Sequence, residues 1–90
     1  MKRIRIIFKG RVQGVGFRWT ISNTAHKYAI SGFCSNLDNG DVLVEIQGNS
    51  DNLDAFMQDI LKSQNYIRID DYTIKQIDIV TDETVFDVKY

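Results

Sequence analysis

The first residues of the chain alternate between charged and apolar side chains. Ile4, Ile6 and Phe8 fall on one side of residues 2–9, and Arg3, Arg5 and Lys9 fall on the other. Successive side chains of a strand point to opposite faces. The alternation therefore predicts a strand over residues 2–9 with one buried face and one exposed, basic face.

The pattern then changes to helical spacing. A glycine-rich stretch follows the strand, and a helix is predicted to begin at about Gly16. Its apolar stripe consists of Phe17, Ile21, Ala25 and Tyr28. Gly32 follows shortly after this stripe and predicts the end of the helix.

Two strand-like runs, residues 33–37 and 42–47, flank the sequence Asp-Asn-Gly-Asp at residues 38–41. An Asn-Gly pair between two such runs is the strongest short signal for a β-hairpin. The sequence therefore predicts a hairpin in which Val42, Val44 and Ile46 face the core.

Ser50 is predicted to cap a second helix. The apolar stripe of this helix consists of Leu53, Phe56, Met57, Ile60 and Leu61. Residues 63–71 are polar and predict a connection, with a short extended piece at 66–69. A strand is predicted over residues 72–80, with a bulge near residues 75–76 where the alternation slips by one. A last short strand contains Phe86, Val88 and Tyr90.

The predicted order is strand, helix, strand, strand, helix, strand, followed by a short terminal strand. Two helices of this length cannot cover both faces of a four-stranded sheet, so both are expected on one face. This order is typical of a split β-α-β sandwich of the α+β class, and the sheet is expected to be antiparallel. We expect one domain over residues 1–90.

Composition restricts the function further. No apolar run approaches the ~18 residues of a membrane span, and no signal peptide is evident, so a cytoplasmic protein without membrane contact is expected. Cys34 and His26 are the single cysteine and histidine, which provides no Cys/His cluster, and no bound metal is expected. Cys34 is interpreted as a buried strand residue and His26 as an exposed helix residue. Nothing in the sequence demands more than a monomer.

Charge is distributed unevenly along the chain. Residues 1–30 hold seven cationic and no acidic side chains, whereas residues 31–90 hold twelve acidic and four cationic ones. A positive potential around the first strand and helix would attract a small anion. We interpret Lys2, Arg3, Arg5 and Lys27 as solvated surface charges. Arg11 and Arg18 are interpreted as functional.

Residues 10–18 read GRVQGVGFR and hold three of the six glycines. Glycine permits positive φ, so backbone N–H groups of such a loop can turn toward an anion. The N-terminus of the following helix adds unpaired N–H groups, and Arg18 adds a planar cation that matches phosphate oxygens. The predicted phosphate-binding residues are Arg11, Val12, Gln13, Gly14, Val15, Gly16, Phe17 and Arg18.

Several other phosphate chemistries are excluded by inspection. The chain has no Gly-x-x-x-x-Gly-Lys-Ser/Thr loop, no arginine follows Cys34 closely, and the acidic pairs at residues 70–71 and 82–83 are read as solvated charges. An arginine without a nearby acid or base suits a phosphate whose leaving group is a weak base, such as a carboxylate with a pKa of about 4–5. Asn36 is either a residue that positions the attacking water or a hairpin-end residue that bonds its own backbone.

The sequence resembles the acylphosphatase family. The motifs are GRVQGVGFR at residues 10–18, GFCSNLDNG at 32–40 and the strand at 42–48, and the resemblance covers essentially the whole chain. It implies a ferredoxin-like fold and an enzyme that hydrolyses small acyl phosphates to a carboxylate and phosphate without metal or cofactor. It also implies that Arg18 binds the phosphate, that Asn36 orients the water, and that the phosphate itself takes the water's proton.

Two positions depart from the family pattern. Ser35 stands where family members usually carry Lys or Arg, and residues 63–71 lack a common Gly-Pro turn. Neither change involves Arg18 or Asn36, so at most a reduced or altered activity is expected.

Two alternatives share the predicted order of elements. One is an anion-binding or regulatory module, like the related domain of carbamoyl-transferring maturation proteins. The other is an RNA-binding domain, which needs exposed aromatics on a basic sheet face. Because the exposed side of the first strand offers no aromatic residue, no nucleic-acid partner is expected.

Overall fold

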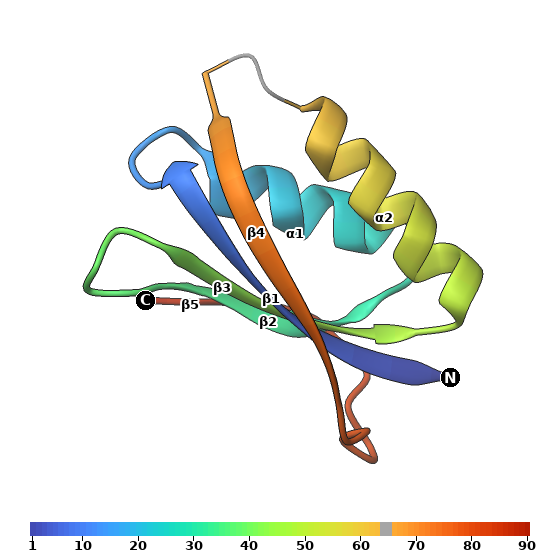
Figure 1. Ribbon diagram of the computed structural model, residues 1–90. Helices are drawn as coiled ribbons and strands as arrows, with labels where there is room; N and C mark the ends of the chain where they lie inside the picture. Colours follow the sequence, from blue (N-terminus) through green and yellow to red (C-terminus); the bar gives the residue numbers. More distant parts are fainter. Residues whose placement is uncertain (64–65) are drawn as a thin grey trace.

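A computed structural model describes residues 1–63 and 66–90 of the chain. Its elements follow in the order β1 (Lys2–Arg11), α1 (Phe17–Lys27), β2 (Ser31–Asn36), β3 (Val42–Gly48), α2 (Ser50–Lys62), β4 (Arg68–Ile77) and β5 (Phe86–Lys89). The strands form one sheet in the order β4-β1-β3-β2-β5, and both helices cover one of its faces (Figure 1). The predicted α+β class and ferredoxin-like architecture are confirmed. Within the described ranges, no helix is long and apolar enough to cross a membrane.

Strand β1 lies inside the sheet, between β4 and β3, and pairs antiparallel with both. Ile4, Ile6 and Phe8 are buried beneath the helices, as predicted. Their partners on β3 are Ile46, Val44 and Val42, which are also buried. Strands β2 and β3 pair antiparallel on either side of the turn at residues 37–41, so the hairpin prediction is confirmed. Strands β1 and β3 together supply the floor of the core.

Helix α1 buries Phe17, Ile21 and Ala25, as the apolar stripe predicted, but Gly32 does not end it. The helix ends at Lys27, and the chain then turns through Ala29, whose φ of 53° is left-handed. Gly32 lies within β2 with a φ of 139°, where a Cβ would come 1.9 Å from the carbonyl oxygen of Glu45. Position 32 therefore requires glycine, because β2 and β3 approach each other too closely there for a Cβ atom.

Helix α2 has a different cap from the one predicted. The side-chain oxygen of Asn49 accepts a hydrogen bond from the backbone N–H of Asn52 at 2.8 Å, and Ser50 is already the first helical residue. Asparagine and serine are equally good caps, so the sequence pattern does not separate two adjacent candidates. The buried stripe of this helix consists of Leu53, Phe56 and Ile60.

The predicted bulge in the fourth strand is misplaced. Strand β4 already begins at Arg68, and its irregularity lies opposite the step from Lys9 to Gly10 of β1 rather than near residues 75–76. A Cβ at Gly10 would lie 2.2 Å from the carbonyl oxygen of Arg68, so the close approach of the two strands needs glycine there. Residues 64–65 of the predicted connection lie outside the described residues.

Strand β5 joins the sheet beside β2, to which it is parallel. Phe86 is buried and Val88 is half-buried, whereas Tyr90 follows the strand and is exposed. The predicted final strand is therefore present, although its last apolar position does not belong to it. The other three strand pairs of the sheet are antiparallel.

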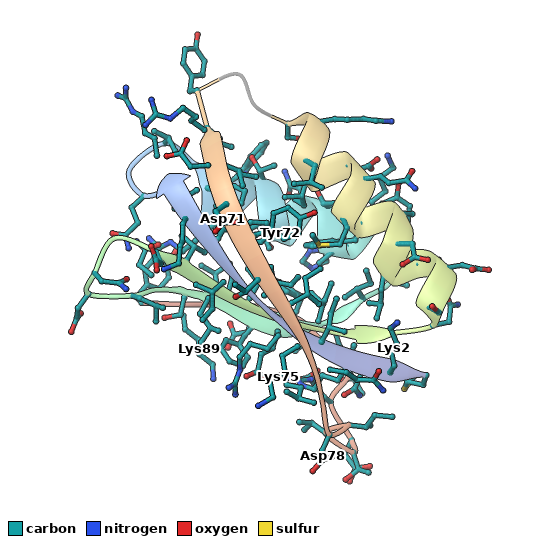
Figure 2. The ribbon with its side chains drawn as sticks, in the orientation of Figure 1. Lys2, Asp71, Tyr72, Lys75, Asp78 and Lys89 are labelled. Carbon is teal, nitrogen blue, oxygen red and sulfur yellow. The ribbon has the colours of Figure 1, made fainter. Side chains whose placement is uncertain are left out.

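The helix-free face of β1 is not simply exposed and basic. Arg3 is only 2% exposed, and its guanidinium binds the carboxylates of Glu45 at 2.9 Å and Glu83 at 2.7 Å. Burial opposes its charge, but the hydrogen bonds that Arg3 donates to these two carboxylates, with the attraction between the charges, outweigh the desolvation and raise the pKa of Arg3. Arg5 also pairs with Glu45. Lys75 and Lys89 project from this same face of the sheet (Figure 2).

Candidate active site

Three segments that are far apart in the sequence meet at one end of the sheet: the β1–α1 loop, the β2–β3 turn and the last residues of the chain (Figure 1). A cavity of about 280 Å³ lies at this end. Its lining residues are Val12, Gly14, Gly16, Phe17, Arg18, Trp19, Ser22, Asn36, Val88 and Tyr90. Six of the residues predicted from the sequence therefore surround a common space.

Glycine gives the β1–α1 loop its shape. Gly14 and Gly16 have φ values of 72° and 78°, and a Cβ at either position would meet nothing within 4 Å. Their role is therefore conformational, because left-handed backbone is costly for other residues. Among the residues that the structure describes, the backbone N–H groups of residues 14–18 donate to no protein acceptor. These groups and the positive end of α1 provide donors for an anion.

Arg18 borders the cavity from the first turn of α1. Its Nη1 donates to the backbone carbonyl oxygen of Lys89 at 3.0 Å, and its guanidinium carbon lies 4.7 Å from the centre of the Tyr90 ring. A guanidinium has five N–H donors, so these contacts orient the group and leave other donors for a ligand. The end of the chain thus holds Arg18 in place.

The uneven charge seen in the sequence is largely neutralised in the fold. Arg3 and Arg5 pair with Glu45, Lys9 pairs with Asp41 at 2.6 Å, and Lys27 pairs with Asp59 at 3.0 Å. Within residues 1–63 and 66–90, Arg11 and Arg18 form no ion pair with a carboxylate. The positive charge that remains therefore includes both arginines of the glycine-rich segment.

Three of the predicted loop residues do not line the cavity. Arg11 is exposed at the end of β1, where its register partner is Arg68. Val15 packs against the core and lines a neighbouring hollow. Gln13 turns toward the β2–β3 turn, where its Nε2 donates to the carbonyl oxygens of Leu37 at 2.7 Å and Asp41 at 2.8 Å. Gln13 therefore fastens the loop to the turn that follows Asn36.

Replacing Gln13 with leucine is expected to lower stability and activity together. The variant loses both hydrogen bonds, worth about 0.5–1.5 kcal/mol each. The loop is then free to shift, and misplacement of about 1 Å at a reacting site can lower the rate about 100-fold. Urea unfolding measures the first effect, and hydrolysis of an acyl phosphate, the substrate that the family resemblance implies, measures the second. Gln58→Leu, at an exposed position of α2, is the matched control. Unchanged activity in Gln13→Leu would exclude this positioning role.

Asn36 is the last residue of β2, and its side chain lines the cavity. Its Oδ1 atom is buried and has no hydrogen-bond partner among the described residues. A buried acceptor of this kind is uncommon, since most such groups are paired with protein or water. The hairpin-end interpretation, in which this side chain bonds its own backbone, therefore finds no support at Oδ1.

Ser35 lies on the opposite face of β2 from Asn36, because neighbouring strand residues point to opposite faces. Its hydroxyl donates to the backbone carbonyl oxygen of Asn36 at 3.3 Å. A lysine or arginine at this position would leave the strand on the helix-free side and away from the cavity. The departure from the family pattern at Ser35 therefore removes no residue that lines the site.

Cys34 is buried, as predicted, and burial raises the pKa of its thiol to about 11. A thiol with such a pKa is almost fully protonated at neutral pH and is a poor nucleophile. Its Sγ lies 4.0 Å from the backbone oxygen of Arg18, so it packs beneath the site. Among the described residues, no group of three or more His, Cys, Asp or Glu side chains is placed to hold a metal.

Sequence reasoning did not place Trp19, Ser22, Val88 and Tyr90 at the site. Ser22 lies four residues after Arg18 and therefore on the same helix face, because residues three and four apart on a helix are neighbours. That spacing was a usable signal for Ser22. Trp19 directly follows Arg18, so the same rule does not place it at the site. Val88 and Tyr90 reach the cavity only because β5 pairs with β2, and no local pattern indicates this pairing.

The fold and the cavity define a ferredoxin-like domain. Its candidate site lies at the end of the sheet where the β1–α1 loop and the β2–β3 turn meet. A family model described as "Acylphosphatase" matches residues 4–88. An acylphosphatase of Clostridium beijerinckii is 39% identical over 90 residues and one of Oceanobacillus iheyensis is 41% identical over 91 residues, each with full coverage of both chains. The crystal structure of the Bacillus subtilis acylphosphatase is similar, with a TM-score of 0.93, 29% identity and full coverage of both chains.

The chain therefore belongs to the acylphosphatase family, whose enzymes hydrolyse acyl phosphates. A structure of full-length HypF in a phosphate- and nucleotide-bound form is also similar, with 28% identity and a TM-score of 0.91. This chain covers 12% of the length of HypF. It covers the full length of the Clostridium beijerinckii and Oceanobacillus iheyensis acylphosphatases.

Proposed function

We propose that the phosphate group of the substrate binds to Arg18 and to the backbone N–H groups of the β1–α1 loop, and that Asn36 orients the attacking water. The observation that carries this proposal is the convergence of unpaired groups on one cavity. Residues of the loop, Arg18 with its remaining donors, and Asn36 with its buried, unpartnered Oδ1 all line it.

Charge stabilisation supplies most of the catalysis in this proposal. During phosphoryl transfer, negative charge accumulates on the three non-bridging oxygens of the phosphate. Donors that are already oriented toward these oxygens stabilise that charge without having to reorganise. The contacts of Arg18 with Lys89 and Tyr90 provide such preorganisation.

In this proposal Asn36 positions the attacking water, and the substrate accepts the proton that the water loses. The amide oxygen accepts a hydrogen bond from the water and so holds it in line with the bond that breaks. Among the described lining residues, none is an aspartate, glutamate, lysine or histidine. A phosphate oxygen therefore takes the proton. The carboxylate leaves without a general acid because its pKa of about 4–5 makes it a weak base.

We further propose that residues 1–90 act as one domain, because a single buried cluster includes residues of both helices and of the outer strand β5. A monomer suffices, since all the proposed site residues come from one chain. Nucleic acid is not a proposed partner, because Glu45 pairs with both Arg3 and Arg5 on the helix-free face.

The test is hydrolysis of benzoyl phosphate by the purified protein in the presence of EDTA. Turnover well above the spontaneous rate is expected, with no stimulation by added Mg²⁺ or Zn²⁺. Phosphate binding detected by NMR without turnover would instead favour an anion-binding module. Loss of activity on chelation would contradict the metal-independent mechanism.

A further inference from the structure

The cavity is larger than a phosphate group requires. Its volume of about 280 Å³ corresponds to roughly nine water molecules at about 30 Å³ each. A phosphate has five heavy atoms, so a substantial part of the space remains beside the loop and Arg18. The side chains that border this remaining space therefore meet whatever is attached to the phosphate.

These side chains come from one face of α1 and from the end of the chain. Helix α1 contributes Trp19 and Ser22, and the opposite side contributes the half-buried Val88. Arg18 is the one lysine, arginine or histidine among the described lining residues. An uncharged acyl group therefore suits this part of the cavity better than an acyl group that carries a free carboxylate. Such a carboxylate would find no cation besides Arg18, which the phosphate occupies.

Three aromatic residues line the cavity, and Trp19 is the one that contacts neither a ring nor a cation among the described residues. Phe17 is buried in an edge-to-face contact with Phe8, and the ring of Tyr90 lies against the guanidinium of Arg18. Trp19 is 71% exposed, and among the described residues it contacts no other aromatic ring and its indole N–H has no acceptor. A large flat apolar surface is thus presented at the rim of the site.

We infer that Trp19 and Val88 bind the acyl group of the substrate and that the enzyme prefers a flat, uncharged acyl group, such as an aromatic one, over acetyl. This inference rests on the proposed function, because it requires the phosphate to occupy the loop. Offset stacking on the indole and burial of apolar surface provide the preference. In this inference the contact between Trp19 and the acyl group is the same in the bound substrate and in the transition state, so Trp19 acts on KM.

The first experiment compares benzoyl phosphate with acetyl phosphate in the wild type and in Trp19→Ala. The wild type is expected to have the lower KM for benzoyl phosphate. Trp19→Ala is expected to raise that KM about tenfold, at the lower end of the discrimination that apolar pockets achieve, with the KM for acetyl phosphate nearly unchanged. Trp19→Phe is expected to retain most of the preference. Val85→Ala, which truncates an exposed apolar side chain that lines neither this cavity nor the neighbouring hollow that Trp19 also borders, is the control.

A second measurement needs no turnover. Trp19 is the single tryptophan of the chain, so its fluorescence reports on this position alone. Benzoate added in the presence of inorganic phosphate is expected to change the emission in a saturable way, and acetate at the same concentration is not.

The outcomes separate this inference from the proposed function. If Trp19→Ala lowers kcat/KM equally for both substrates, or if benzoate leaves the fluorescence unchanged, the acyl site is wrong while the phosphate site stands. If Arg18→Gln hydrolyses both substrates like the wild type, the phosphate site is wrong, and the acyl site, which depends on it, is overturned as well.

Discussion

Replacing Arg18 with glutamine is expected to lower kcat/KM for benzoyl phosphate by about 10³-fold or more. A single arginine that stabilises a phosphoryl transition state contributes about 10³–10⁵ in rate. Glutamine keeps the length and a hydrogen-bond donor but removes the charge and the planar fork. Inorganic phosphate should also bind more weakly, because the same group holds it. Steady-state kinetics and NMR titration with phosphate measure the two losses.

The fold of the Arg18→Gln variant is expected to remain intact. The side chain is only half-buried, and it forms one hydrogen bond, with the backbone of Lys89, together with its contact with Tyr90. Loss of such contacts costs about 1–2 kcal/mol, which does not unfold a typical domain. Circular dichroism and urea unfolding check this. Arg5→Gln, which removes an arginine outside the cavity, is the matched control. Near-normal turnover in Arg18→Gln would contradict the proposed phosphate site.

Replacing Asn36 with alanine is expected to lower kcat by about 10²–10³, the range found when one positioned polar group is removed from a reacting centre. The KM for benzoyl phosphate should change little. A residue that places the water acts on the reaction step, whereas Arg18 also contributes to binding. The two variants should therefore differ in how the loss divides between kcat and KM. That division is the measurement that assigns their roles.

The neighbouring Ser35 provides the control for Asn36. Ser35→Ala changes the same strand but alters a side chain that points away from the cavity, and it is expected to keep nearly full activity. The Asn36→Ala variant should also be as stable as the wild type, because no hydrogen bond of the buried Oδ1 within the described residues is lost. If Asn36→Ala turns over at the wild-type rate, the water is held by another group.

The local patterns of the sequence predicted most of the fold because each element carries its own periodicity. Alternation identified the buried side of β1, helical spacing identified the core residues of both helices, and the Asn-Gly pair identified the turn between β2 and β3. These signals depend only on residues that are close in the sequence, so they can be recognised without the tertiary structure. The glycine-rich segment and Arg18 were placed correctly at the end of β1 for the same reason.

The misassigned features depend on contacts between distant residues. Arg3 looked like a solvated surface charge, but Glu45 and Glu83 neutralise it from other segments. Gly32 looked like a helix stop, although the constraint on it is the backbone of β3. No periodicity along one stretch of chain contains information about such partners.

The candidate site shows the same division. Arg18, Asn36 and the glycines lie in short motifs that can be recognised from the sequence alone. Gln13 was read as part of the phosphate cradle, whereas its side chain bonds the turn after Asn36. Val88 and Tyr90 enter through the parallel pairing of β5 with β2. The residues proposed to act on the substrate can thus be found from short sequence motifs. The residues that position them depend on contacts between distant segments, which such motifs do not reveal.

The interior position of β1, between β4 and β3, has a consequence for how the chain folds. Arg3 pairs with Gln47 on one side and with Ile77 on the other, so the first strand finds both neighbours only after long loops have closed. Closing such loops costs entropy before any native pairing compensates for it, and domains dominated by distant pairings fold in milliseconds to seconds rather than microseconds. A newly made β1 therefore remains unpaired along one edge until β3 has been synthesised and along the other until β4 has been synthesised.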